Sequence, residues 1–278
     1  MKDLIDLHVH STASDGTFSP EELVQLAIKR NLRAFALTDH DTIAGIRAAQ
    51  EAAKPYQLEI IPGIELSVYY ENIEVHLVGL GFEITNSAFL KHLTAFQHSR
   101  VQRNLEIIRK LQAQNILITY EKMLEQFGDT VWTRAHFASY LKHHNYVTNM
   151  GEAFTKYIGN DAPCYVPREK VDILDAIQLI HDAGGYAILA HPLLYNLSNH
   201  ELDSMLHTLS SSHLDGLEVF YSNNRHGDEA YLKRLADKYH LKYSGGSDFH
   251  GRNKPNIQLG VGKGNISIPY LIWEKIQS

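Results

Sequence analysis

The feature that most constrains the fold is a recurring unit in which an apolar strand ends in a chemically reactive side chain and a helix follows. Such strand ends occur at His8 and His10, at Asp39 and His40, at Glu65, at His191, and at Asp248 and His250. Alternating strands and helices favour parallel strands with right-handed crossovers. Roughly seven strands can be recognised in the 278 residues, enough for a barrel. The site of a parallel β/α barrel lies at the C-terminal ends of its strands.

The first of these strand ends places two histidines two residues apart. Residues i and i+2 of a strand point to the same face, so His8 and His10 offer two imidazoles to one point, and imidazole is a common metal ligand. A pair of surface histidines on an edge strand is the alternative for these two residues alone. A random scatter of the chain's 17 histidines would not place one at the end of four different strands, which favours the metal site.

Two further candidate ligands lie beside these strand ends. Asp15 is in the loop after the first strand, on the same rim. His76 lies near the start of a predicted strand, but a hairpin after Glu65, over residues 66–82, can return it to the barrel mouth. Imidazoles and carboxylates without paired cysteines suit zinc, manganese or iron. Because the candidates outnumber the ligands of one ion, we expect two or three ions, an arrangement typical of phosphatases and nucleases.

Local signals divide the chain into two parts. Ser19 and Pro20 predict the N-terminus of a helix, and Asp41 is expected to cap another helix over residues 42–53. Residues 86–158 contain helical patterns and almost no strand-like run. We therefore expect a barrel domain of residues 1–95 and 166–278, and a helical insertion of residues 96–165 that covers the barrel mouth.

Composition excludes several classes of protein. A formal net charge of -6 does not indicate a polybasic nucleic-acid binder, and Cys164 is the only cysteine, so no internal disulfide is possible. The first residues lack the apolar segment of a signal peptide, and no run of about 18 apolar residues occurs. We expect a soluble cytoplasmic protein with no membrane segment and no evident stable protein partner.

The motifs together resemble the PHP (polymerase and histidinol phosphatase) family over nearly the whole chain. They are His8-Val9-His10, Thr38-Asp39-His40-Asp41, Gly63-Ile64-Glu65, His191-Pro192 and Ser247-Asp248-Phe249-His250. The insertion resembles the subgroup once called TrpH. This resemblance implies an α/β fold, a distorted (β/α)7 barrel with an inserted α-helical subdomain. It also implies a metal-dependent phosphoesterase that hydrolyses the 3'-phosphate of nucleoside 3',5'-bisphosphates, such as adenosine 3',5'-bisphosphate, and that can act as a 5'-3' exoribonuclease on short RNA.

Carried over residue by residue, the resemblance implies a site for three divalent ions, manganese in the first place, with zinc or iron as alternatives. The first ion would bind His8, His10, Glu65 and Asp248, the second Glu65, His76 and His191, and the third Asp15, His40 and His250. Glu65, His191 and Asp248 would be the catalytic residues. All these positions carry suitable side chains.

Other residues have both a functional and a structural interpretation. Arg134 and His136, in the insertion, form either a clamp for a second phosphate or an exposed helix face. Asn223 and Arg225 follow a strand at the active rim, where they either contact substrate or form a turn. Asp39 is a candidate to orient a ligand imidazole.

Two other functions remain open at this level. A histidinol-phosphate phosphatase would use the same metals with a different pocket, and the helical insertion argues weakly against it. A non-catalytic PHP module that serves interactions would be marked by lost metal ligands, and none is lost here.

Overall fold

The computed structural model describes residues 3–278; residues 1 and 2, with which the predicted barrel domain begins, lie outside the described residues. The chain forms two compact units, one of the residues up to Lys91 with Lys170–Ser278, and one of His92–Glu169. We call them the barrel unit and the helical unit. The covering role expected for the insertion stays a prediction.

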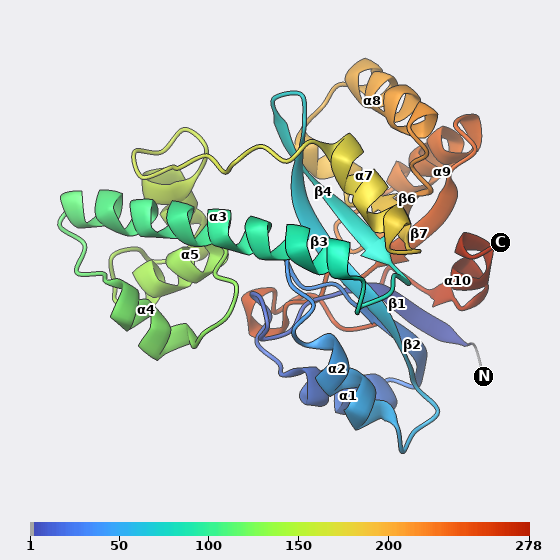
Figure 1. Cartoon of the computed structure of the whole chain (residues 1–278), viewed down its shortest axis with the longest axis horizontal. Coiled ribbons are helices and arrows are strands. Elements are labelled where there is room, and N and C mark those ends of the chain that lie inside the picture. Colours follow the sequence, from blue (N-terminus) through green and yellow to red (C-terminus); the bar gives the residue numbers. More distant parts are fainter. Residues whose placement is uncertain (1–2) are drawn as a thin grey trace. The chain divides into compact units, whose positions relative to one another are not determined.

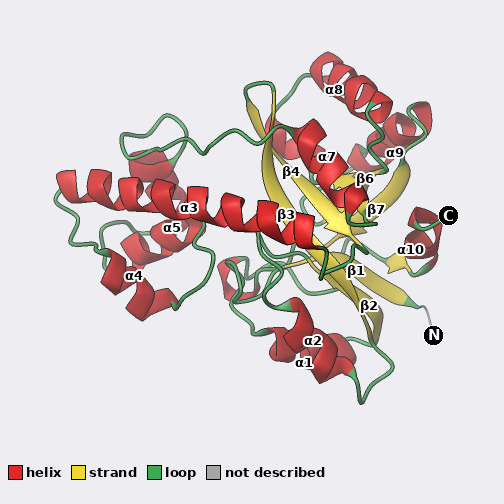
Figure 2. Cartoon of the chain, in the orientation of Figure 1, coloured by secondary structure: helices red, strands yellow, loops and turns green. Residues whose placement is uncertain are grey.

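The helical unit contains helices and no strand (Figure 2). Its elements are α3 (Ser87–Ala113, which starts before the boundary), α4 (Tyr120–Phe127), α5 (Arg134–His143), α6 (Met150–Ala153) and a π-helical turn (Phe154–Ile158). Trp132, Phe137 and Tyr140 belong to a buried core of its own. The helical patterns of the insertion are thus confirmed as helices.

The barrel unit is a mixed sheet of eight strands in the described residues, in the order β7-β6-β5-β4-β3-β2-β1-β8 (Figure 1). The strands are β1 (Leu4–Val9), β2 (Leu32–Leu37), β3 (Glu59–Tyr70), β4 (Ile73–Leu80), β5 (Tyr186–Leu189), β6 (Gly216–Tyr221), β7 (Lys242–Gly246) and β8 (Ile268–Pro269). β4 runs antiparallel to β3 and β5, whereas β1–β3 and β5–β7 are parallel within each group. The expected distorted barrel is confirmed.

The sheet curves round until the segment after β7 comes beside β1. The N–H of Asp248 donates to the carbonyl of His8 at 2.9 Å, and the N–H of His10 donates to the carbonyl of Phe249 at 3.0 Å. These bonds nearly close the barrel. They also bring the first and last histidine motifs of the chain together.

Helices surround the strands of the barrel unit (Figure 1). They are α1 (Pro20–Lys29), α2 (Ile46–Ala53), α7 (Ile173–Asp182), α8 (Asn199–Ser211), α9 (Asp228–Lys238) and α10 (Leu271–Ile276), with short 3-10 turns at Pro192–Tyr195 and Gly251–Asn253. The predicted start of α1 is confirmed, since Ser19 accepts from the N–H of Glu22 and Pro20 is the first helical residue. The prediction that Asp41 caps the second helix is wrong. α2 begins at Ile46, and Asp41 accepts instead from the N–H of Ser67 at 3.1 Å.

A bulge in β1 turns the metal motif toward the site. Ile5 and Leu7 belong to an apolar cluster with alternate residues of β2–β5 and with Trp273 of α10. In a regular strand, His8 and His10 would face the opposite side from Ile5 and Leu7. The pairing of β1 with β2 is irregular between Asp6 and Val9, and such a bulge re-aims the residues that follow.

Two strands differ from the expectation. β3 continues through Glu65 to Tyr70, so Glu65 lies inside a strand rather than at its end, and His76 pairs with Ser67 in the middle of β4. The long antiparallel pair therefore supplies both ligands from its middle. β8 was not predicted, because a two-residue strand carries no periodicity.

We predict that Gly246→Ala destabilises the barrel unit. A Cβ at Gly246 would overlap the backbone and Cβ of His8, which cannot move without displacing the closing bonds. The cost should be about 3 kcal/mol, the upper end of overpacking penalties. The control is Gly264→Ala, which meets nothing within 4 Å and has only its φ of 87° to strain it, at about 1 kcal/mol. Equal thermal unfolding midpoints for the two variants would contradict this.

Candidate metal centre

All nine predicted ligands lie in the barrel unit and come together at one end of the barrel. They come from β1 and the loop after it (His8, His10, Asp15), from the end of β2 (His40), from the middle of β3 and β4 (Glu65, His76), and from the ends of β5 and β7 (His191, Asp248, His250). Eight of the nine are buried, and His76 is half-buried. Four overlapping groups of three or four of these residues have ligand atoms within 4.8 Å of one another.

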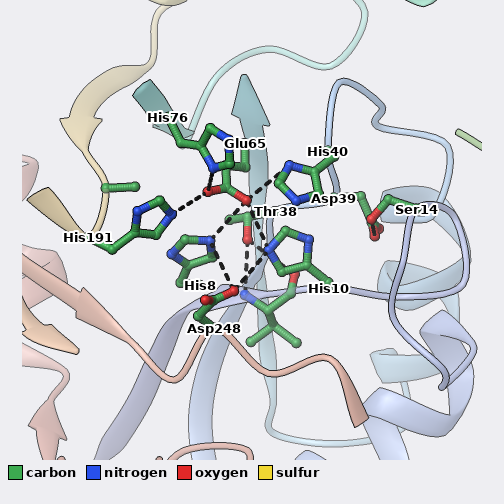
Figure 3. Close-up of polar contacts among 12 residues, drawn as sticks. His8, His10, Ser14, Thr38, Asp39, His40, Glu65, His76, His191 and Asp248 are labelled. Carbon is green, nitrogen blue, oxygen red and sulfur yellow. Dashed lines mark hydrogen bonds and ion pairs between the residues drawn. The ribbon is translucent and has the colours of Figure 1, made fainter. Parts of the chain in front are cut away.

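Glu65 is the centre of the arrangement (Figure 3). Its Oε2 lies 3.3 Å from His8 Nε2, 3.1 Å from His10 Nε2 and 3.1 Å from His40 Nδ1. Its Oε1 lies 2.7 Å from His76 Nδ1 and 2.9 Å from His191 Nε2. One carboxylate thus faces two different sets of imidazoles with its two oxygens, which is the geometry of a bridging ligand.

A second carboxylate gathers the remaining ligands. Asp15 Oδ1 lies 3.2 Å from His250 Nε2 and 3.7 Å from His10 Nδ1, and its Oδ2 lies 3.8 Å from His40 Nε2. Together with His10, these residues form the one group of four. His10 therefore stands between the groups, because its other nitrogen faces Glu65 and Asp248.

Buried nitrogen atoms without hydrogen bonds indicate what the site is built to hold. Within residues 3–278, His8 Nε2 and both ring nitrogens of His10 make no hydrogen bond although they are buried. Buried polar groups normally have partners, and exceptions need a physical explanation such as an ion. The side chains are those that zinc, manganese and iron prefer. The residues present therefore fit divalent metal ions.

Charge within the cluster reinforces this fit. Burial alone would raise the pKa of Glu65, but the surrounding His40, His76 and His8 hold it well below its ordinary value. Burial lowers the pKa of His8, yet Glu65 and Glu218 outweigh this and raise it well above its ordinary value. A proton on His8 would thus offset part of the buried negative charge, whereas burial and the neighbouring His250 hold the pKa of His10 well below its ordinary value. A bound cation would replace the proton on His8, because ligand imidazoles must be neutral.

Glu218, which the sequence did not single out, holds His8 and His191 in place. Glu218 Oε1 accepts from His8 Nδ1 at 2.9 Å, and its Oε2 accepts from the backbone N–H of His191 at 2.6 Å. Since an ionised carboxylate can only accept, this bond keeps a proton on His8 Nδ1, and in the neutral imidazole that a metal ion needs, Nε2 would be the nitrogen left for the ion. A charged residue in the middle of the apolar strand β6 was the available signal for Glu218.

Asp248 is held from its far side. Its Oδ2 accepts from Tyr221 at 2.8 Å and from Lys254 Nζ at 2.6 Å, while its Oδ1 faces His8 and His10. The Lys254 ammonium and His250 outweigh the effect of burial and hold the pKa of Asp248 far below its ordinary value. No sequence signal pointed to Lys254, which lies in a loop after the motif.

Asp39 does not orient a ligand imidazole. Its carboxylate accepts from the N–H of Ser11 at 2.8 Å and from the Ser11 hydroxyl at 2.6 Å. It also accepts from the Ser14 hydroxyl at 2.6 Å, and Figure 3 shows Ser14 beside Asp39. Burial raises the pKa of Asp39 to about 6. Asp39 thus fixes the loop that carries Asp15, and that expectation from sequence was wrong.

The predicted substrate residues fall into two places. Asn223 and Arg225 line a pocket of about 510 Å³ together with the ligand His191. Arg134 and His136 lie in the helical unit, where Arg134 Nη1 donates to Asn160 at 2.7 Å and His136 Nδ1 accepts from the N–H of Thr133 at 3.0 Å. This contact of His136 with Thr133 is part of the N-terminal cap of α5. The sequence did not reveal this structural role.

The PHP domain model matches residues 6–252 of the chain. The chain belongs to the PHP domain family. It is 38% identical to a 5'-3' exoribonuclease of Haemophilus influenzae, over 97% of this chain and 98% of that protein. It is 30% identical to a 3',5'-nucleoside bisphosphate phosphatase of Chromobacterium violaceum, over 99% and 96% of the two chains. A solved amidohydrolase structure from Chromobacterium violaceum has a TM-score of 0.88 at 30% identity and covers 98% of this chain and 95% of that chain.

In this PHP protein the site is a histidine and carboxylate cluster able to bind divalent metal ions. Among the described residues, no helix is both long and apolar enough to cross a membrane. The cytoplasmic location expected from the sequence stays a prediction.

We predict that Glu218→Ala weakens metal binding without removing a ligand. His8 would lose the acceptor that fixes its ring and tautomer, and loss of such a contact lowers metal affinity about 10- to 100-fold. Calorimetric titration of the metal-free protein with Mn²⁺ measures the change. Glu218→Gln, which keeps an acceptor oxygen, should recover part of the affinity. Wild-type affinity in Glu218→Ala, with an unchanged unfolding midpoint, would refute this role.

Proposed function

We propose that this protein is a metal-dependent phosphoesterase that removes the 3'-phosphate of nucleoside 3',5'-bisphosphates and that acts by the same chemistry on short RNA. The observation that carries the proposal is Glu65, whose two oxygens face separate sets of imidazoles at 2.7–3.3 Å. Sites with two neighbouring ions are typical of phosphatases and nucleases. The names of the two relatives, an exoribonuclease and a bisphosphate phosphatase, support the same substrate class.

The proposed site holds two or three ions, with manganese as the first candidate. As the family resemblance implies, His8, His10, Glu65 and Asp248 would bind the first, Glu65, His76 and His191 the second, and Asp15, His40 and His250 the third. The ligand atoms of His10 lie close to those of both the first and the third set. When bound, these ions would lower the pKa of water and neutralise phosphoryl oxygens.

The residues of the chain perform the rest of the work. Glu65 would set the spacing of the site, while His191 and Asp248 would hold its two sides, and all three side chains are buried. Water attacks phosphorus in line, the bond from phosphorus to the 3'-oxygen breaks, and a proton passes to that oxygen. Because water itself would be the nucleophile, the reaction needs no serine or cysteine nucleophile and forms no phosphorylated side chain.

The helical unit would bind the part of the substrate that does not react. Arg134 lies beside Asn160, and its guanidinium faces the ring of Tyr165 at 5.6 Å. A guanidinium binds a phosphate through paired hydrogen bonds. We assign Arg134 to the 5'-phosphate and retain His136 as a weaker candidate. Asn223 and Arg225 would contact the substrate on the barrel side.

The deciding experiment is phosphate release in the presence of Mn²⁺ from adenosine 3',5'-bisphosphate, AMP and histidinol phosphate. We expect a clear preference for the bisphosphate, because only it supplies a phosphate to the metals and another to Arg134. Preference for histidinol phosphate would refute the proposed substrate while leaving the metal site intact. No turnover of any of the three by the metal-loaded protein would favour a module for interactions instead.

Arg134→Ala should raise KM for the bisphosphate by about tenfold to a hundredfold, the worth of a hydrogen-bonded charge. A simple aryl phosphate, which has no second phosphate, should be much less affected. The matched control is Arg109→Ala, because Arg109 is an exposed arginine of α3 whose guanidinium pairs with Glu106. Equal effects of Arg134→Ala on both substrates would argue against the clamp.

A further inference from the structure

A pocket of about 510 Å³ opens directly beside the metal centre. His191 forms part of its wall, and so does Tyr221, whose hydroxyl donates to Asp248 at 2.8 Å. One proposed metal ligand, His191, thus lies in the wall, and a second, Asp248, is hydrogen-bonded to a residue of the wall. The volume falls within the range of about 300–1,000 Å³ typical of small-molecule sites. All residues that line it belong to the barrel unit.

The chemistry of the proposed reaction requires such a space for only one class of substrate. A 3'-phosphate monoester and a 3'-5' phosphodiester release the same 3'-oxygen, and they differ in one substituent on phosphorus. In the monoester that substituent is an oxygen atom. In the diester it is the 5'-oxygen of the next nucleoside, which needs room immediately beside the ions. A closed wall here would restrict the protein to bisphosphates.

The side chains of the pocket suit a nucleoside. Leu193 and Leu194 provide an apolar surface, and Leu194 is 49% exposed. The face of a base can pack against apolar side chains. The amides of Asn196 and Asn223 offer donors and acceptors to ribose hydroxyls and base edges.

Arg225 adds a positive charge at the same pocket. Its backbone N–H donates to Asp228 Oδ2 at 2.7 Å, but within residues 3–278 its exposed guanidinium makes no hydrogen bond or ion pair. It is therefore available to a second phosphate of a nucleic-acid chain. A bisphosphate bound with its 3'-phosphate at the metals has no phosphate left for this position.

We propose that this pocket binds the nucleotide downstream of the scissile phosphate, with the base on Leu193 and Leu194 and the following phosphate at Arg225. The proposal rests on the proposed phosphoesterase function and extends it. It assigns the specificity for a chain, as opposed to a bisphosphate, to the barrel unit. One metal centre then serves both substrates, and the pocket decides how well the diester is held.

The test compares kcat/KM with Mn²⁺ for adenosine 3',5'-bisphosphate and for the 5'-phosphorylated dinucleotide and trinucleotide of adenosine. Leu194→Asp should lower kcat/KM for both oligonucleotides by about tenfold relative to the bisphosphate, because it removes the apolar surface and adds a repulsive charge. Arg225→Ala should lower it by about tenfold more for the trinucleotide than for the dinucleotide, since the dinucleotide lacks the following phosphate. Arg225→Lys should recover most of that loss.

Leu271→Asp is the matched control, because Leu271 is a leucine of similar exposure, 53%, on α10 and outside the pocket. It should leave kcat/KM for the bisphosphate, the dinucleotide and the trinucleotide unchanged. Equal losses on the bisphosphate and the oligonucleotides in Leu194→Asp would overturn the assignment of the pocket. Wild-type protein that hydrolyses the bisphosphate and neither oligonucleotide would also overturn it, with the phosphoesterase function intact. Wild-type protein that hydrolyses none of the three, although metal is bound, would instead refute the proposed function itself.

Discussion

The buried carboxylate of Glu65, surrounded by five imidazoles, is the interaction on which the rest of the structure depends. A buried charge is tolerated only when it is paired or bound to a metal. Its partners come from β1 and the residue after it, from the segments after β2 and β5, and from β4, so the sheet must curve strongly to bring them to one point. Asp248 reaches His8 and His10 from the segment after β7, so the closing contact between that segment and β1 is also a condition for the site.

Much of this could be predicted from the sequence because ligands such as His8, His40 and His191 follow apolar strands directly. Parallel β/α topology then requires such strand ends to meet. The prediction worked less well where the topology departs from that rule. Glu65 and His76 come from the middle of a long antiparallel pair, and the irregular pairing of β1 with β2 between Asp6 and Val9 is not revealed by any local pattern.

The residues behind the ligands were the hardest to predict. Glu218 contacts His8 although the two are more than 200 residues apart in the sequence. Lys254 contacts Asp248 from only 6 residues away. Each contact depends on the folded barrel rather than on local periodicity. Asp39 shows the converse, since its position inside a motif suggested a contact with an imidazole, whereas the fold uses it to fix the loop of Ser11 and Ser14. Together these contacts orient the ligands before any ion arrives, which favours a defined geometry over adaptable binding.

The central claim is that Glu65 bridges ions that the reaction requires. The most direct measurement is the manganese content of wild-type protein and of Glu65→Ala, combined with phosphate release from adenosine 3',5'-bisphosphate at saturating Mn²⁺. The account predicts two or three ions in the wild type, fewer in the variant, and loss of nearly all turnover in a variant that remains folded. Full activity of folded Glu65→Ala at saturating Mn²⁺ would contradict it.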